Sequence, residues 1–322
     1  MLTQPAPLAT EHVLAGCTVD LVGVPARLSA GEADGADALA GLFRAARPSA
    51  EAPLVSIHAT MDDVALPAVD PDVSTDEFDM WRDDGTLYVR QRRGVVARLV
   101  AGAVTIGGRA DSYPVVFRRT ALTVLPALLA PHDVQLVHAA AIARGERAVL
   151  VLGTSGAGKS TLAFCALRGG WDVLSDDLVG VRGEGAALAV TGVPRPFAVP
   201  TELLDDGVTV ASALGEQRRR RELPADVVAH GWRGVAGIVV VEHGEDARGE
   251  LERIDAHSVL RGVLSSWSPS GGAHDLAAIL PPAAELARRP ALVLRLGREV
   301  EARVADAVSL LERAGDELGC AP

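Results

Sequence analysis

The spacing of hydrophobic positions divides the chain into two parts with different patterns. In the first part the signals are short: alternating segments at residues 17–24, 54–59, 86–90 and 95–106 predict strands, and residues 36–46 have helical spacing. The acidic, proline-containing stretch 61–77 predicts a loop. An apolar helix is predicted over 119–130, where Pro131 ends it. We therefore expect a smaller N-terminal α+β domain over residues 1–120.

The second part has longer apolar segments in a regular order. Strands are predicted at residues 136–143 and 147–152, followed by a glycine-rich loop, a short helix, Gly169-Gly170 and a strand at 171–174. Further strands are predicted at 237–241 and 291–296, and helices at 258–265, 276–280 and 299–314. The order strand, glycine loop, helix, strand is typical of a nucleotide-binding α/β core. The sequence therefore predicts an α/β catalytic domain over residues 121–322.

Composition narrows the classes of partner. The 322 residues include 31 basic and 42 acidic side chains, which gives a net charge of −11. This balance argues against a protein that holds nucleic acid or a membrane surface by charge. No run of about 18 apolar residues predicts a membrane span, and the N-terminus lacks the pattern of a signal peptide. Three scattered cysteines predict neither a disulfide framework nor a metal pair, so we expect a cytoplasmic protein.

A phosphate-binding motif follows the predicted strand 147–152. Residues 153–160, GTSGAGKS, match G-x-x-x-x-G-K-[ST], and the predicted helix comes next. Glycines let the backbone approach a polyphosphate closely, so that helix N-terminal amides point at its oxygens. The motif lysine, Lys159, is the only lysine in the chain, whereas the other 30 basic residues are arginine. The residues predicted to bind nucleotide are Gly153, Thr154, Ser155, Gly156, Ala157, Gly158, Lys159, Ser160 and Thr161.

Two adjacent aspartates end the next predicted strand. Asp176 follows Lys159 by 17 positions, which leaves room for one helix, a turn and one short strand. Asp176 and Asp177 should therefore lie at the carboxyl end of a strand, where α/β sheets bind ligands. At a phosphate site one carboxylate can hold Mg²⁺ together with Ser160, while the other takes a proton from an attacking hydroxyl.

These motifs together resemble the catalytic core of the HPr kinase/phosphorylase family, and in particular its HPr kinase-related members. The resemblance covers residues 138–181, with His138 one hairpin ahead of the loop and the aspartate pair after the helix, and residues 193–199, VPRPFAV, add to it. It implies a P-loop kinase core of the type also found in phosphoenolpyruvate carboxykinase. It further implies that Asp176 is the catalytic base, that Asp177 holds Mg²⁺, and that His138 supports the pair electrostatically.

This chain departs from the family pattern in two places. HPr kinases proper have glutamate directly after the loop serine, where this chain has Thr161, and residues 1–120 do not match their N-terminal domain. The resemblance therefore leaves the acceptor of the phosphoryl group open among hydroxyl-bearing peptides, proteins and small metabolites.

Two arginine features remain open from the sequence. Arg195 lies between two prolines, and its guanidinium could stabilise a transferring phosphoryl group or belong to an ordinary loop. The cluster Arg218 to Arg221 could contact phosphates or an acidic peptide, or form a solvated surface. No histidine spacing predicts a zinc site.

We therefore predict a kinase that uses ATP and Mg²⁺ to phosphorylate a serine-like hydroxyl, with Asp176, His138, Lys159 and Arg195 as the candidate catalytic residues. The N-terminal domain is expected to select the acceptor or to serve in assembly, which is compatible with a homo-oligomer. Two alternatives stay open: an NTPase that couples hydrolysis to a conformational change, and a nucleotide-sensing binding module.

Overall fold

A computed structural model describes residues 8–109, 113–200, 203, 220–243, 249–267, 276–296 and 300–320. The described chain forms two compact units. Unit 1 contains the described residues up to Val134 together with Pro194–Pro196, and unit 2 contains the rest. The division falls after Val134 rather than at the expected boundary of 120/121, because helix α3 (Tyr113–Leu129) spans that boundary and contacts α2, β7, β8 and β9 of unit 1.

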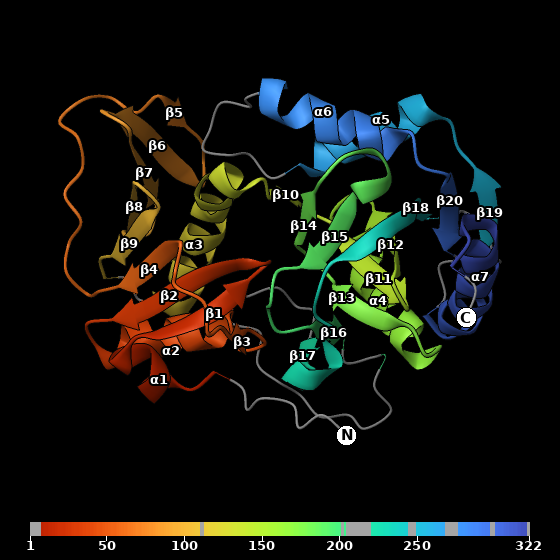
Figure 1. The fold of residues 1–322 in the computed structure, drawn as a ribbon, viewed down its shortest axis with the longest axis horizontal. Helices are drawn as coiled ribbons and strands as arrows, with labels where there is room; N and C mark the ends of the chain where they lie inside the picture. Colours follow the sequence, from red (N-terminus) through yellow and green to blue (C-terminus); the bar gives the residue numbers. More distant parts are fainter. Residues whose placement is uncertain are drawn as a thin grey trace. The chain divides into compact units, whose positions relative to one another are not determined.

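Unit 1 is a nine-stranded sheet with helices. The strand order is β3-β1-β2-β4-β9-β8-β7-β6-β5, and β2, β4 and β9 are parallel while the other neighbours are antiparallel (Figure 1). Helix α2 packs on β2 and β4, α3 packs on β7, β8 and β9, and the two helices contact each other, so they cover one face of the sheet. The elements are α1 (Thr10–Ala15), β1 (Cys17–Leu21), β2 (Val24–Ala30), α2 (Ala33–Leu42), β3 (Arg47–Pro48), β4 (Val55–Ala59), β5 (Val73–Ser74), β6 (Phe78–Asp83), β7 (Thr86–Gln91), β8 (Val96–Val100) and β9 (Ala103–Gly107).

Two predicted strands of unit 1 are hairpins in the structure. Residues 17–24 divide into β1 and β2, and residues 95–106 divide into β8 and β9. Each turn has two residues with positive φ, Val22-Gly23 in the first and Ala101-Gly102 in the second. Such two-residue turns match the right-handed twist of paired strands. The apolar alternation continues through both turns, which is why the pattern alone predicts single strands.

Unit 2 is an α/β unit with helices on both faces of a mixed sheet. The strand order is β10-β14-β15-β18-β12-β11-β13, and β20 pairs with β18 and β19. The strands are β10 (Gln135–Val137), β11 (Ala140–Arg144), β12 (Arg147–Leu152), β13 (Asp172–Ser175), β14 (Val179–Arg182), β15 (Ala189–Gly192), β18 (Arg233–His243), β19 (Glu250–Arg253) and β20 (Ala291–Leu296), with β16 (Ala198–Pro200) and β17 (Arg220–Glu222) as a separate pair. The mixed α/β class expected from the sequence is thus confirmed at this coarse level.

The helices of unit 2 enclose its sheet. Helices α5 (Ala256–Ser266) and α6 (Leu276–Ala287) contact each other, and their apolar residues share a core with alternate residues of β11 and β12. Helix α4 (Lys159–Arg168) contacts β11 and β13, and α7 (Val300–Leu318) contacts α4, β18 and β20 (Figure 1). Five consecutive residues of β12, Ala148 to Leu152, are buried. A strand covered on both faces is continuously apolar, which explains the uninterrupted run in the sequence.

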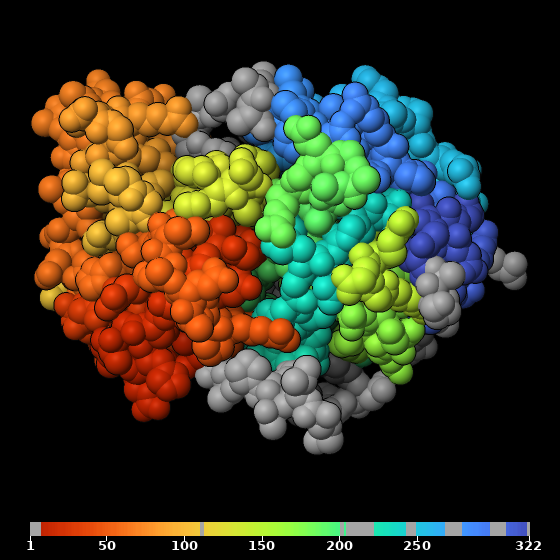
Figure 2. Space-filling model, in the orientation of Figure 1, coloured from red at the N-terminus to blue at the C-terminus, as the bar shows by residue number. Residues whose placement is uncertain are grey.

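A short 3₁₀ turn between β14 and β15 packs on helix α6. In this turn, η2 (Gly185–Ala187), the N–H of Gly185 donates to Glu285 Oε2 at 3.1 Å, and Arg289 donates to the Gly185 carbonyl. In the space-filling view, the bright green atoms of this region lie next to blue atoms from later in the chain (Figure 2). The contact ties the β14–β15 hairpin to the helical layer of unit 2.

The predicted strand 136–143 is interrupted in the structure. It divides into β10 and β11, with His138 and Ala139 between them. The N–H of His138 donates to the Ser266 carbonyl at 2.6 Å, at the end of α5. At this interruption the chain passes from one end of the sheet toward the other. Strand β10 pairs with β14, whereas β11 pairs with β12 and β13.

Among the helices in the described part of the chain, none is both long enough and apolar enough to span a membrane.

Candidate functional site

The strand order of unit 2 brings the three predicted motifs to one edge of the sheet. Strand β11 lies between β12 and β13 and is antiparallel to both. Its first residue therefore lies at the edge where β12 and β13 end, with Ala140 opposite Val151 and Ala141 opposite Ser175. The glycine loop follows β12, the aspartate pair follows β13, and His138 precedes β11. All three consequently meet at this edge.

The glycine loop runs from β12 into helix α4. Gly156 and Gly158 have φ values of 84° and 108°, a region that disfavours residues with a Cβ atom. A Cβ at Gly153 would lie 2.8 Å from the Val241 carbonyl oxygen of β18, whereas a Cβ at Gly156 would meet no atom within 4 Å. Gly158 is the N-cap of α4, and no described side chain caps the first turn. The loop therefore leaves open space beside Gly156, just ahead of a helix N-terminus, and helix N-termini stabilise anions.

Lys159 is folded back over the loop. Its side chain is only 6% exposed, and Nζ donates to the Gly153 carbonyl at 2.7 Å and to the Thr154 carbonyl at 3.2 Å. Burial lowers the pKa of Lys159, while Asp177 and Asp176 act in the opposite direction and favour the charged form. The single lysine thus lies within the electrostatic range of both aspartates.

The aspartate pair occupies the short connection between β13 and β14. Ser175, which is buried, ends β13, and its Oγ accepts hydrogen bonds from the N–H of Asp177 at 3.2 Å and of Leu178 at 3.1 Å. Such a serine turn fixes the backbone of the residues that follow it. Both aspartates are half-buried, so their carboxylates remain accessible to a ligand.

His138 contacts the second aspartate. Its Nδ1 lies 3.1 Å from Asp177 Oδ1, and the two side chains are 44% and 39% exposed. The family resemblance implies that His138 supports the pair, with Asp176 as the base. In the structure, the imidazole ring faces Asp177, the second member of the pair.

Two residues that hold the acidic connection were not singled out from the sequence. One is Ser175, and the other is Gly192, which ends β15 and packs against the end of β13. A methyl group at Gly192 would overlap the Leu174 carbonyl oxygen and lie 3.1 Å from the Ser175 Cβ. The serine before the aspartates was a local signal for a turn, but the close approach of Gly192 has no signal in a single sequence.

We expect Gly192→Ala to lower the free energy of unfolding by about 1–3 kcal/mol, because β15 must move away from the end of β13. The activity proposed below should fall as well, since the moved strand end carries the acidic pair. Urea unfolding and initial rates measure the two effects.

The control is Gly262→Ala in α5, where the added Cβ meets only Leu152 Cδ1, at 3.8 Å. In this variant the free energy of unfolding should rise by about 0.5–1 kcal/mol. A Gly192→Ala protein with wild-type stability and rate would show that this close approach does not hold the site.

The remaining candidates are placed less directly. Arg195 is half-buried and groups with unit 1, whereas the glycine loop belongs to unit 2, so its contact with a phosphoryl group stays a prediction. Arg218 and Arg219 lie outside the described residues, while Arg220 and Arg221 belong to β17 and pair with Pro200 and Val199 in the β16–β17 ladder.

Comparisons with known proteins give likenesses to solved structures only. No protein-family model matches the chain, and no curated protein matches it. Among solved structures, the Hpr(Ser) kinase/phosphatase from Coxiella burnetii aligns with 57% of this chain and 99% of its own, with 12% sequence identity and a TM-score of 0.29. Because a TM-score of this size is too low to argue from, we base the functional proposal on the geometry of the site.

Proposed function

We propose that this protein is a P-loop kinase that transfers the γ-phosphoryl group of ATP to a serine-like hydroxyl. One observation carries the proposal: the edge of a single sheet brings together a glycine loop with a buried lysine and an Asp-His pair with a half-buried carboxylate. The loop suits a polyphosphate, and the pair suits a group that loses a proton.

The residues present fit a nucleotide with Mg²⁺. Open space at Gly156 and the first turn of α4 suit the phosphates, and Lys159 supplies a compact positive charge. Ser160, in the first turn of α4, and Asp176 offer oxygen atoms, the type of ligand that Mg²⁺ prefers. When bound, Mg²⁺ would neutralise charge on the phosphate oxygens.

The contact of His138 with Asp177 supports an exchange of the two aspartate roles that the resemblance implies. An imidazole that occupies Oδ1 of Asp177 competes with a metal ion for the same oxygen. The same imidazole orients the carboxylate for accepting a proton. We therefore propose Asp177 as the base, His138 as its positioning residue, and Asp176 as the Mg²⁺ ligand.

In the proposed reaction each residue has one task. The loop amides and Lys159 hold the phosphates, and Asp177 takes the proton of the acceptor hydroxyl as its oxygen attacks phosphorus. The hydroxyl oxygen forms the new bond to phosphorus, the bond from phosphorus to the bridging oxygen breaks, and ADP leaves with that oxygen. We further propose that unit 1 takes part in acceptor selection and that the protein acts in the cytoplasm.

Measuring ADP and free phosphate with and without hydroxyl acceptors tests this function. With ATP and Mg²⁺ alone, a kinase should release almost no ADP; with its acceptor, ADP should form without an equal amount of free phosphate. Serine, N-acetylserine amide and a set of serine-containing peptides serve as first acceptors, and mass spectrometry detects the added phosphate. Equal release of ADP and phosphate without acceptor would favour the NTPase instead. Saturable ATP binding without turnover under every condition would favour the sensing module.

A further inference from the structure

A row of polar side chains crosses the sheet of unit 1. Strand register places these residues directly opposite one another on adjacent strands, so they share one face of the sheet. Their alternating neighbours Ile57, Val89 and Ala97 are buried, as expected for the face under α2 and α3, so the polar row lies on the other face. The row is Ser29, His58, Thr105, Arg98, Tyr88 and Trp81.

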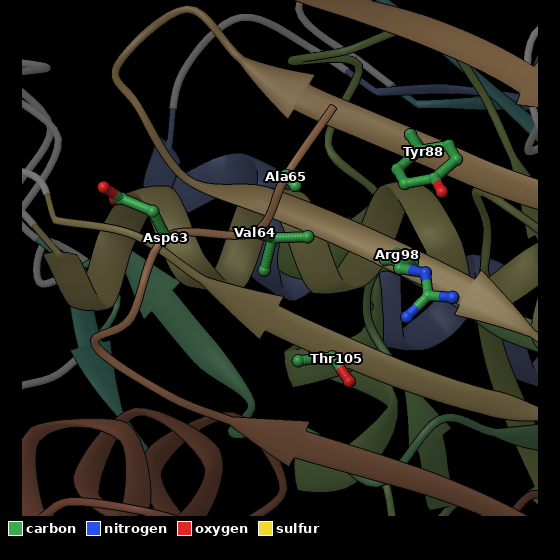
Figure 3. Close-up of a pocket in the computed structure, with 6 residues that line it drawn as sticks. All are labelled: Asp63, Val64, Ala65, Tyr88, Arg98 and Thr105. Carbon is green, nitrogen blue, oxygen red and sulfur yellow. The ribbon is translucent and has the colours of Figure 1, made fainter. Parts of the chain in front are cut away.

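Part of this row lines a cavity. Tyr88, Arg98 and Thr105 form its sheet side, and the segment 61–72, which we term the strap, contributes Asp63, Val64 and Ala65. The cavity has a volume of about 300 Å³. Figure 3 shows the Tyr88 hydroxyl directed toward the Arg98 guanidinium, while the Asp63 carboxylate lies at the opposite end. Three hydrogen-bond donors therefore face one part of the cavity, and Val64 and Ala65 give it an apolar wall.

Contacts at several points hold the strap over the sheet. The Trp81 Nε1–H donates to the Val69 carbonyl at 2.9 Å, and the Arg82 N–H donates to Asp72 Oδ2 at 2.6 Å. At the other end, Gly107 lies so close to the Asp62 carbonyl and the Val64 side chain that a Cβ would overlap them. The cavity is thus preformed, which reduces the entropy lost when a ligand binds.

Arg98 differs from Arg90 and Arg92, two arginines on the same face. Arg90 and Arg92 both pair with the buried carboxylate of Asp79, at 2.6 Å and 3.0 Å. Among the described residues, no hydrogen bond or ion pair engages the guanidinium of Arg98, and the same holds for the hydroxyls of Tyr88 and Thr105. The chain has a net charge of −11, yet this cavity is lined by one positively charged guanidinium and two hydroxyl groups, all three available to a ligand.

We propose that this cavity binds the carboxylate group of a small ligand. A carboxylate accepts two parallel hydrogen bonds from a guanidinium, and two hydroxyls can complete its shell. With a single cation, and with Asp63 in the wall, the cavity favours a monoanion over the dianionic phosphate group. Its volume is at the lower limit for ligand sites. The occupant is therefore the size of one small amino acid, either free or as the C-terminal residue of a peptide. All of its lining residues belong to unit 1, so binding can be tested without ATP.

The test is a ligand-observed NMR titration of the full chain with N-acetyl-L-alanine, its amide, L-alanine and inorganic phosphate. N-acetyl-L-alanine should bind saturably, its amide should not, and phosphate should bind more weakly. L-alanine distinguishes the two sources of the carboxylate: tighter binding than N-acetyl-L-alanine identifies a free amino acid, and weaker binding identifies a peptide terminus.

Matched variants assign the binding to this cavity. Arg98→Gln should weaken N-acetyl-L-alanine binding by about 10- to 100-fold, whereas Arg93→Gln, which removes a charge from the exposed β7–β8 turn, should not change it. Thr105→Val keeps the shape of a strand residue, removes one hydroxyl and provides a second test if Arg98→Gln does not fold. The proposal is wrong if both cavity variants bind as wild type does, if the amide binds as well as the acid, or if phosphate binds more tightly than the carboxylates.

Discussion

Lys159→Arg is expected to lower kcat/KM for the proposed phosphoryl transfer by about 10²- to 10³-fold, although the charge is retained. The reason lies in the space around the side chain. Lys159 is 6% exposed, and its Nζ fits between the Gly153 and Thr154 carbonyls. A planar guanidinium is wider than an ammonium group and cannot make the same contacts without displacing the loop. Initial rates at saturating Mg²⁺, with the acceptor identified by the screen above, measure the loss.

The chain offers a matched control on the same helix. Arg168 lies in the last turn of α4 and is exposed, so Arg168→Lys should leave the rate and the free energy of unfolding unchanged. The double variant Lys159→Arg/Arg168→Lys keeps one lysine in the chain but moves it to the other end of the helix, and it should be as inactive as Lys159→Arg alone. Near-wild-type transfer by Lys159→Arg would remove this residue from the proposed phosphate contacts.

Asp177→Asn is expected to lower kcat by about 10²- to 10⁴-fold, because asparagine keeps the shape of the side chain but cannot take the acceptor proton. Asp176→Asn should act differently: the Mg²⁺ concentration needed for half-maximal rate should rise, and part of the rate should return at high Mg²⁺. Rates measured over a range of Mg²⁺ concentrations separate the two effects. If Asp176→Asn loses kcat at every Mg²⁺ concentration and Asp177→Asn is rescued by Mg²⁺, the roles follow the family resemblance instead.

Two further variants make the aspartate experiment interpretable. Asp172→Asn removes an exposed carboxylate at the start of β13 and should leave the rate unchanged. His138→Gln removes the ring that contacts Asp177, and it should reduce kcat less than Asp177→Asn does. Because His138 acts through Asp177, adding His138→Gln to Asp177→Asn should cost little more. Fully additive losses would show that the histidine acts separately from this aspartate.

Local sequence was a good guide where one physical cause determines the structure. The glycine loop is one example, because a chain that passes at once from a buried strand into a helix needs glycines at the positions with positive φ. The buried strand β12 is another, because a strand covered on both faces must be apolar throughout.

Sequence was a poorer guide where the outcome depends on distant residues. It predicted a single strand over residues 136–143, since nothing in the apolar run indicates that His138 and Ala139 separate β10 from β11. It could not reveal that Gly192 packs against the end of β13, because a close approach between strands leaves no local pattern. The row from Ser29 to Trp81 was also hidden, since its residues come from six strands whose register is set by pairing.

The sequence by itself determined the glycine loop, its single lysine and the acidic pair, because each is a short segment whose chemistry depends on neighbouring residues. Only the tertiary structure decided that His138 meets Asp177 rather than some other partner. That contact depends on β11 lying between β12 and β13 and running antiparallel to both. Strand order and direction arise from hydrogen bonds and packing between segments far apart in the chain, and these are properties of the whole sheet.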